Sequence, residues 1–357
     1  GLTANLTYEA PYLFARRLST LDHLSNGRVG WNIVTGYLDS AARAMGLAQQ
    51  PAHDRRYDQA DDFLTLAYKL WEGSWHDDAV RADKVQRLYV QSDKVQPIAH
   101  EGPYYRAHAI HMSAPSPQRT PVLFQAGTSA RGMQFAGQHG EGIFIGASSP
   151  EAARETSRKL RAAAVAAGRR ADDVKIYVGL AVVVGHTEAE AREKYADYRA
   201  YASAEGGLAH FAASTGVDFA QYDLDEPIPF GQSNAIQSAA QIAQQSGWTT
   251  RRKLLEQFTL GSRYPTLVGD PIQVADALER WVDVGEIDGL NLTRIVVPQT
   301  WEDFATLVVP ELQHRGRYRT HYTPGTLRQQ LFGRGDRLPD HHPGARWRYQ
   351  AQARSAV

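Results

Sequence analysis

The chain has 357 residues, in which 39 lysines and arginines balance 39 aspartates and glutamates, and it contains no cysteine. A chain of this length can bury a large core, as one α/β domain or as two smaller ones. The charge balance argues against electrostatic binding of nucleic acid or an anionic membrane, and the lack of cysteine excludes disulfides, thiolate metal ligands and cysteine nucleophiles. No apolar run reaches the roughly 20 residues of a membrane span and no signal segment stands at the start, so we expect a cytoplasmic protein.

Strands and helices alternate in the first part of the chain. A strand over Gly1–Thr7 precedes an amphipathic helix over Tyr12–Leu24, in which leucines recur at helical spacing. The next strand, Val29–Val34, ends in the polar Thr35, where a barrel strand would deliver a side chain to a site. His53–Trp71 then carries the apolar stripe of a long helix.

The middle of the chain is irregular at first and then strand-rich. Residues 73–118 have no helical period and predict a loop that carries small strands. Buried strands are predicted at Thr120–Gln125, Gly142–Gly146 and Val174–Gly185, with an alanine- and arginine-rich helix over Pro150–Gly168.

The last part opens with a helix over Thr187–Ala204, in which Thr187 and Glu190 match a capping box. Residues 206–262 predict an insertion. The remaining predicted elements, in chain order, are helical pieces at Ile236–Gln245 and Thr249–Leu260, a helix over Gly269–Val284, a sixth strand over Gly289–Val297, a helix over Trp301–Arg315, and a surface tail over 323–357.

This alternation of helices with apolar strands predicts a parallel α/β fold. Polar residues at strand ends favour a TIM barrel over an open sheet, and six strands are two short of the eight that such a barrel needs. We therefore expect the first two β/α units to precede Gly1. The barrel domain would cover 1–322, with the loop 73–118 and the insertion 206–262 as excursions.

The run PVLFQAGTSARGMQFAGQHG (Pro121–Gly140) predicts an anion site. It reads as a buried strand, a small-residue turn from Ala126 to Ser129, and a helix that opens near Ala130. Free N–H groups and the positive end of a helix dipole at such a point suit a phosphate, and Arg131 adds a candidate charge. The sequence fits equally well an ordinary strand–turn–helix corner in which Ser129 only caps the helix.

Long ordered runs resemble the bacterial luciferase-like flavin monooxygenases, more narrowly the group of nitrilotriacetate monooxygenase component A, dibenzothiophene-sulfone monooxygenase and pristinamycin synthase. These runs are LDHLSNGRVGWNIVTG, HDRRYDQADDFLTLAYKLW, LFQAGTSARGMQFAGQHGEGIF, VGDPIQVADALERWVDVGEIDGLNL and WEDFATLVVPELQHRGRYRTHY. YDLDEPIPF and the tail TPGTLRQQLFGRGDRLPDHHPGARWR look most like the dimethyl-sulfide and long-chain-alkane monooxygenase branch.

The resemblance implies a (β/α)8 barrel of luciferase-like type with a helical insertion after strand seven, and a chain that lacks the first two β/α units. It also implies a two-component enzyme. Reduced FMN (FMNH2) would come from a separate NAD(P)H:flavin reductase, and a C4a-peroxyflavin formed with O2 would oxygenate a small sulfide, sulfone, amine or alkane. A homo-oligomer is plausible from the family.

The resemblance also assigns flavin contacts to residues of this chain. The FMN phosphate would sit on Gly127, Thr128 and Ser129, with Tyr57 and His53 reaching it from the preceding helix. The flavin ring and ribityl chain would lie near strand ends. The residues expected there are Asn32, Thr35 and Thr7. By spacing alone Tyr57 is simply a core tyrosine.

The catalytic residues are not assigned. Some relatives carry a histidine just after the equivalent of Thr35, whereas Gly36 and Tyr37 follow here. Tyr37, His53 and Trp31 are pocket candidates. A cofactor that carries the difficult chemistry explains the lack of a Ser/His/Asp or metal constellation.

Other titratable residues have simpler interpretations. His108 and His111 lie in a non-helical stretch without carboxylate support, so we expect no metal site. The His341–His342 pair is expected to be solvated, and Asp58, Asp61 and Asp62 are expected to form a solvated helix face.

Two functions of other kinds stay open. The chain could be a truncated, non-catalytic remnant that binds flavin or phosphate. It could also be a deazaflavin-dependent oxidoreductase on the same barrel, although the WNIVTG and QAGTSARG runs look more like the FMN group.

Overall fold

The computed structural model describes residues 1–230, 240, 243–244, 246–260 and 264–350. At its centre lies a parallel sheet of seven strands in the order β1-β2-β7-β8-β9-β10, with β11 also paired to β9. The strands are β1 (Leu2–Asn5), β2 (Gly30–Val34), β7 (Val122–Gln125), β8 (Gly142–Ile145), β9 (Lys175–Val184), β10 (Thr266–Gly269) and β11 (Gly289–Thr293). The predicted parallel α/β fold is confirmed.

The register of this sheet brings three strand ends together. Asn5 at the end of β1 lies opposite Val34 at the end of β2, and Ile33 of β2 lies opposite Gln125 at the end of β7. Because carboxyl ends of parallel strands meet at one edge of a sheet, the loops after β1, β2 and β7 are neighbours.

Helices connect and cover the strands, as the alternation predicted. They are α1 (Pro11–Leu24), α2 (Asp39–Ala44), α3 (His53–Tyr68), α4 (Ala130–His139), α5 (Pro150–Ala166), α6 (Glu188–Ala200), α7 (Ala204–Thr215), α9 (Arg251–Gln257), α10 (Pro271–Gly285), α11 (Gln299–Asp303), α12 (Val309–His314) and α13 (Leu327–Phe332). A π-helical turn, Lys69–Gly73, continues α3.

Local sequence signals explain several of these helix boundaries. Ser149 caps α5, with Pro150 at the first helical position. Asp270 and Gln273 form a reciprocal capping box at the start of α10. In both cases the cap satisfies backbone N–H groups that would otherwise lack a partner.

Two hydrophobic clusters hold the sheet to its helices. In the first, Trp31 of β2 packs against Phe14 of α1 and against Phe63 and Trp71 of the α3 segment. In the second, the apolar strand β9 packs against α5 and α10. A third cluster lies apart and joins α7, α9 and the segment between them through Phe211, Phe219 and Phe258.

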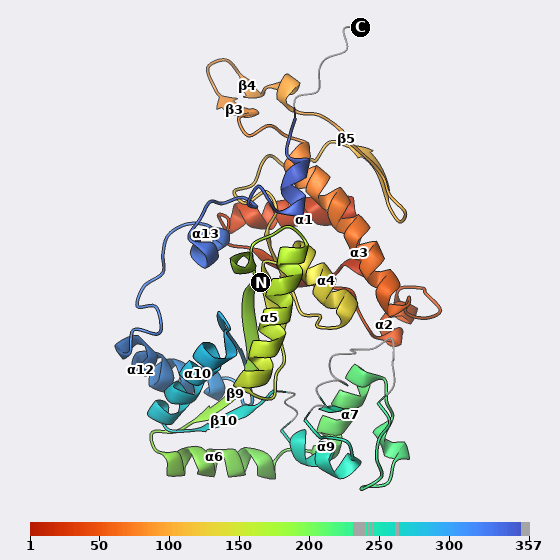
Figure 1. The fold of residues 1–357 in the computed structure, drawn as a ribbon. Coiled ribbons are helices and arrows are strands. Elements are labelled where there is room, and N and C mark those ends of the chain that lie inside the picture. Colours follow the sequence, from red (N-terminus) through yellow and green to blue (C-terminus); the bar gives the residue numbers. More distant parts are fainter. Residues whose placement is uncertain (231–239, 241–242, 245, 261–263, 351–357) are drawn as a thin grey trace.

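Figure 1 shows how these parts are arranged. The α7–α9 unit lies at the lower right, away from α4 and α5, and the hairpin of β3 (Val80–Asp83) and β4 (Leu88–Val90) projects at the top beyond α1 and α3. A second hairpin joins β5 (Ile98–Glu101) to β6 (Arg106–Ala109). The small strands expected within residues 73–118 are therefore present.

Some expected elements differ from the structure. The sheet contains a seventh strand, β10, which is only four residues long and ends directly before the cap of α10. The helix expected over Thr187–Ala204 breaks at Tyr201 into α6 and α7. The helix expected over Ile236–Gln245 lies largely outside the described residues.

The tail over 323–357 is more than a surface wrapping. It contains α13, and the Arg328 side chain on this helix is fully buried. Within the described part of the chain β1 pairs with β2 alone, so the sheet pairing does not close into a ring. No helix in that part is long and apolar enough to span a bilayer.

Candidate flavin and substrate site

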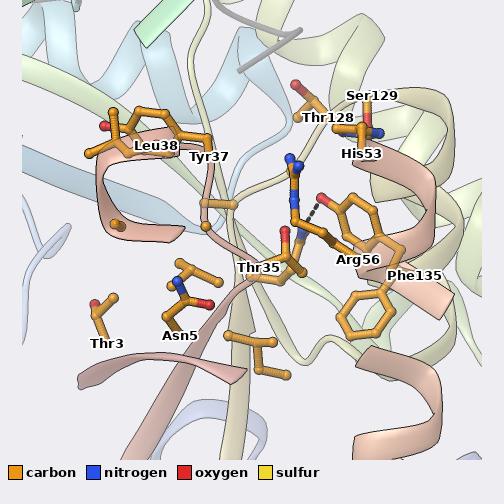
Figure 2. Close-up of a pocket in the computed structure, with 18 residues that line it drawn as sticks. Thr3, Asn5, Thr35, Tyr37, Leu38, His53, Arg56, Thr128, Ser129 and Phe135 are labelled. Atoms are coloured by element: carbon orange, nitrogen blue, oxygen red, sulfur yellow. Dashed lines mark hydrogen bonds between the residues drawn. The ribbon is translucent and has the colours of Figure 1, made fainter. Parts of the chain in front are cut away.

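A cavity of about 410 Å³ opens at the carboxyl ends of β1, β2 and β7 (Figure 2). Its wall comes from these strand ends, the start of α2, the first turns of α3, and the turn between β7 and α4. The lining residues are Thr3, Asn5, Ile33, Val34, Thr35, Gly36, Tyr37, Leu38, Ala41, His53, Arg56, Tyr57, Gln125, Ala126, Gly127, Thr128, Ser129 and Phe135.

The turn between β7 and α4 is shaped by glycine. A Cβ atom on Gly127 would lie 2.3 Å from the Tyr57 hydroxyl oxygen and 2.4 Å from Gln125 Nε2. One on Gly132 would lie 2.9 Å from Ser129 Oγ and 3.0 Å from the Tyr57 hydroxyl. Only glycine allows the turn and the first turn of α4 to approach these side chains so closely.

Ser129 is the N-cap of α4. Its Oγ accepts a hydrogen bond from the Gly132 N–H at 3.1 Å. The predicted capping role is thus present, and it does not compete with an anion site, because Ser129 also lines the cavity at the positive end of the α4 dipole.

Helix α3 presents His53, Arg56 and Tyr57 to the same cavity. His53 Nε2 lies 3.3 Å from Ser129 Oγ, and its Nδ1 lies 2.7 Å from Asp54 Oδ1. Because a carboxylate only accepts hydrogen bonds, Nδ1 of His53 carries a proton and donates it to Asp54. The contact with Nε2 places the His53 ring beside the Ser129 hydroxyl at the edge of the turn.

The Tyr57 ring is buried, and its hydroxyl accepts a hydrogen bond from Gln125 Nε2 at 3.4 Å. Burial raises the pKa of the Tyr57 phenol, although the nearby Arg56 and Arg131 guanidinium groups oppose this shift. The phenol is therefore neutral at physiological pH and can donate a hydrogen bond into the cavity.

Arg56 is a buried cation of the cavity that the sequence analysis did not single out. It is 1% exposed, and Figure 2 shows its side chain reaching into the cavity from the same helix as His53. Its Nη1 donates to the Pro51 carbonyl at 2.6 Å. Burial lowers the pKa of its guanidinium, while Tyr57 and Tyr8 raise it.

Arg131 does not supply charge to the turn. Its guanidinium donates to Asp58 at 3.0 Å and also to Asp61, and it lies over the Tyr57 ring. Burial alone would raise the pKa of Asp61, but His139 and Arg131 hold it below its usual range. The solvated face expected for Asp58, Asp61 and Asp62 is therefore wrong for Asp61.

The expected solvation is also wrong for Asp62, because the side chain of this residue is buried. The Asp62 carboxylate accepts hydrogen bonds from the N–H groups of Tyr104 and Tyr105 and from His100 Nε2, each at 2.9 Å. This carboxylate ties helix α3 to the β5–β6 hairpin.

The predicted site residues divide into two sets. The structure brings together Thr35, Tyr37, His53, Tyr57, Gly127, Thr128 and Ser129, all of which line the cavity. Thr7, Asn32 and Trp31 do not line it. Thr7 Oγ1 donates to the Thr35 carbonyl at 2.7 Å, and Asn32 Nδ2 donates to Thr3 Oγ1 at 3.1 Å.

The expectation that Trp31 lines the pocket is wrong. Its indole is fully buried among α1 and α3, and its Nε1 donates to the Ala4 carbonyl at 3.2 Å. Neighbouring residues on a strand point to opposite faces, and Trp31 faces the helices. It is therefore a core residue and not part of the pocket.

His111 and His342 have structural roles. His111 is buried, with Nε2 2.9 Å from Ser19 Oγ. His342 is not solvated as expected, since its Nε2 donates to the His139 carbonyl at 3.1 Å and its Nδ1 accepts from the Gly344 N–H. Among the described residues no three metal-binding side chains gather.

Comparison with known proteins identifies the family to which the chain belongs. A model of the luciferase-like monooxygenase family matches residues 2–286. The chain is 47% identical to dimethyl-sulfide monooxygenase of Hyphomicrobium sulfonivorans and 43% identical to long-chain alkane monooxygenase of Geobacillus thermodenitrificans. Each match covers 98% of this chain, and 73% and 76% of the relatives respectively.

A solved structure of riboflavin lyase, bound to modified FMN and its substrate riboflavin, is 42% identical. It superposes with a TM-score of 0.92 over 98% of this chain and 77% of that one. These matches do not establish the expected absence of two β/α units. Because the family model and both relatives match nearly all of the strands and the whole cavity, the chain belongs to the luciferase-like monooxygenase family.

Proposed function

We propose that this chain is the oxygenating component of a two-component flavin monooxygenase. It binds FMN, supplied as FMNH2 by a separate NAD(P)H:flavin reductase, and oxygenates a small organic substrate with O2. The observation that carries the proposal is the meeting of the Gly127–Ser129 turn, Tyr57 and His53 in one cavity at the strand ends. Two relatives at 47% and 43% identity are monooxygenases.

The residues of the cavity fit FMN. The glycine-shaped turn and the start of α4 suit the phosphate, with Thr128, Ser129 and Tyr57 as hydroxyl donors. Gln125 Oε1 is buried without a hydrogen-bond partner among the described residues, so it can accept a further donor. Thr35 stands in the wall where the family places flavin, while Thr7 acts behind it through the Thr35 carbonyl.

These side chains indicate what the protein contributes to the reaction and what the cofactor contributes. Reduced FMN, when bound, supplies the electrons with which O2 is activated. The protein holds the phosphate at the turn, and the apolar wall of Ile33, Val34 and Phe135 keeps water away from the reacting region. Tyr37 and His53 remain the pocket candidates for substrate contact.

The wall also favours a neutral substrate. Leu38 and Ala41 extend the apolar lining, and no carboxylate stands among the described residues that line the cavity. Since Arg56 is the one arginine or lysine there, a polycarboxylate would find few cations. Of the sulfides, sulfones, amines and alkanes that the family suggests, the uncharged and weakly polar sulfides and alkanes suit this apolar lining best.

A second candidate substrate is a flavin. The high structural similarity to riboflavin lyase favours this candidate, and chromatography of riboflavin incubated with the chain and reduced FMN tests it.

The relatives at 43–47% identity give no support to the deazaflavin-dependent and non-catalytic alternatives. We also retain, as proposals, one barrel domain over 1–322 and the insertion over 206–262, because the described part of that insertion has its own core.

A fluorescence titration with FMN tests the site. We expect micromolar binding that Thr128→Ala and Ser129→Ala each weaken about tenfold, because each removes a donor to a charged group. Ser149→Ala is the matched control, since Ser149 caps α5 in the same way but lies outside the cavity. Substrate-dependent O2 uptake with FMNH2 then tests turnover. No binding of oxidised or reduced FMN would overturn the proposal.

A further inference from the structure

Gln50 is a buried polar residue that the proposed function leaves without a role. It lies in the segment 45–52, which returns from α2 to α3 and is otherwise mostly exposed. Gln50 itself is 2% exposed and is not among the cavity-lining residues. Its side chain faces away from solvent, toward the elements that carry the cavity wall.

Three hydrogen bonds join Gln50 to separate parts of the chain. The Tyr8 hydroxyl donates to Gln50 Oε1. Gln50 Nε2 donates to the Thr35 carbonyl at 3.5 Å, and the Gln50 backbone N–H donates to Asp39 Oδ1 at 2.9 Å. One residue therefore connects the turn after β1, the loop after β2, and the start of α2.

The loop after β2 also packs directly against this amide. Gly36 has a φ of +74°, and a Cβ there would lie 2.9 Å from Gln50 Nε2 and 2.6 Å from Asn5 Nδ2. The left-handed backbone at Gly36 is thus held between two amide side chains. Thr35 and Tyr37, on either side of it, both line the cavity.

The opposite wall depends on the same segment. The residue after Gln50 is Pro51, whose carbonyl accepts from Arg56 Nη1 at 2.6 Å. His53 begins α3 two residues later and lines the cavity. A shift of Gln50 would therefore move the Thr35–Tyr37 wall and the His53–Arg56 wall together.

We propose that Gln50 is a positioning residue of the cavity: through Tyr8, Thr35 and Pro51 it fixes the distance between the two walls that receive flavin and substrate. This inference rests on the proposed function for its ligands. The residue touches neither ligand, so its loss should weaken binding more than it slows the chemical step.

The test uses Gln50→Met, which keeps the length of the side chain and removes its hydrogen bonds. Tyr8→Phe removes the donor at the other end and is a milder change. Gln49→Met is the matched control, because Gln49 is the exposed neighbour in the same segment. FMN affinity, substrate KM and kcat, and backbone hydrogen exchange over 35–38 and 51–56 are measured for each.

We expect Gln50→Met to raise the Kd for FMN and the KM roughly tenfold, with kcat changed less than about twofold. Hydrogen exchange should speed up in both walls. The double variant Tyr8→Phe/Gln50→Met should bind no more weakly than Gln50→Met alone, because Gln50→Met already removes the hydrogen bond that Tyr8→Phe deletes. Gln49→Met should resemble the wild type.

Wild-type affinity and KM in both Gln50→Met and Tyr8→Phe would overturn the inference while leaving the proposed function intact. A wild-type chain that bound no flavin would instead overturn the proposed function. Hydrogen exchange needs no flavin, and unchanged exchange in both walls of Gln50→Met would then overturn the positioning role as well.

Discussion

Arg328 and Glu141 form a buried, two-point ion pair between residues 187 positions apart in the chain, with Nε–Oε1 at 2.7 Å and Nη2–Oε2 at 2.8 Å. Their side chains are 2% and 3% exposed. Arg328 also donates to the carbonyls of Thr120 and Asp336. The pair thereby fastens α13 to the residues that precede β7 and β8.

We therefore expect Glu141→Gln to destabilise the fold by about 3–5 kcal/mol, because it leaves a buried guanidinium without its counter-charge. Burial lowers the pKa of Arg328 but Glu141 more than offsets this, so the arginine stays charged. Urea unfolding measures the loss. Arg158→Ala is the control, since it breaks an exposed two-point pair with Glu286. Equal midpoints for both variants would contradict the expectation.

The buried pair of Arg328 and Glu141 also shows why the position of the tail was not predictable from the sequence. The tail was expected to be a surface segment because it is rich in arginine and proline, and a buried arginine is recognisable only with its distant partner. By contrast the Gly127–Ser129 turn was predictable, since strand, turn and helix cap are contiguous in sequence. The four-residue strand β10 is too short for a periodic signal.

Two site candidates from β2 and the loop after it have different environments. Trp31 and Thr35 lie four positions apart, a spacing that puts both side chains on one face of a strand, so the alternation of faces does not distinguish them. Trp31 lies within β2, whereas Thr35 follows the last residue of that strand. The structure turns Trp31 toward α1 and α3 and leaves Thr35 at the cavity. Arg56 was missed although Tyr57 was named, because a charge beside an aromatic residue on a helix gives no sign of burial.

Gly127→Ala should damage the cavity specifically. The added methyl group would meet the Tyr57 hydroxyl and the Gln125 amide, both of which are buried, so one of them must move at a cost of about 1–3 kcal/mol. We expect FMN affinity to fall at least about tenfold. Gly335→Ala is the control, because nothing lies within 4 Å of a Cβ at that exposed position. A titration with unchanged affinity for Gly127→Ala would rule out contact between flavin and the turn.

Asp62→Asn should loosen the β5–β6 hairpin. The carboxylate accepts from three donors, and an amide of the same shape presents an N–H₂ group to at least one of them. Leaving a buried N–H unpaired costs about 1–3 kcal/mol. We expect a lower urea midpoint and faster proteolysis between 101 and 106, whereas Asp58→Asn on the exposed side of α3 should be nearly neutral. Protection of the hairpin in Asp62→Asn would show that other contacts hold it.

His111 should make stability fall in acid. Burial, with help from Arg119 and His23, lowers the pKa of His111 to about 4, from its ordinary value of 6.5. Between these two pH values the unfolded chain binds a proton that the native chain does not, so the free energy of unfolding drops as pH falls, by up to about 1.4 kcal/mol per pH unit. The stabilising effect is complete above pH 6.5 and is lost toward pH 4.

His111→Asn removes this titration. Urea unfolding at pH 7, 6 and 5 should give a shallower decline for the variant than for the wild type, so that the two stabilities converge by about 2 kcal/mol toward pH 5. The exposed His108 provides the control, and His108→Asn should follow the wild-type curve. Carboxylates such as Asp61 add their own loss only at lower pH, since Arg131 and His139 hold its pKa below the usual range despite its burial. Parallel curves for wild type and His111→Asn would mean that His111 can be protonated within the folded chain, at Nδ1, which has no partner among the described residues.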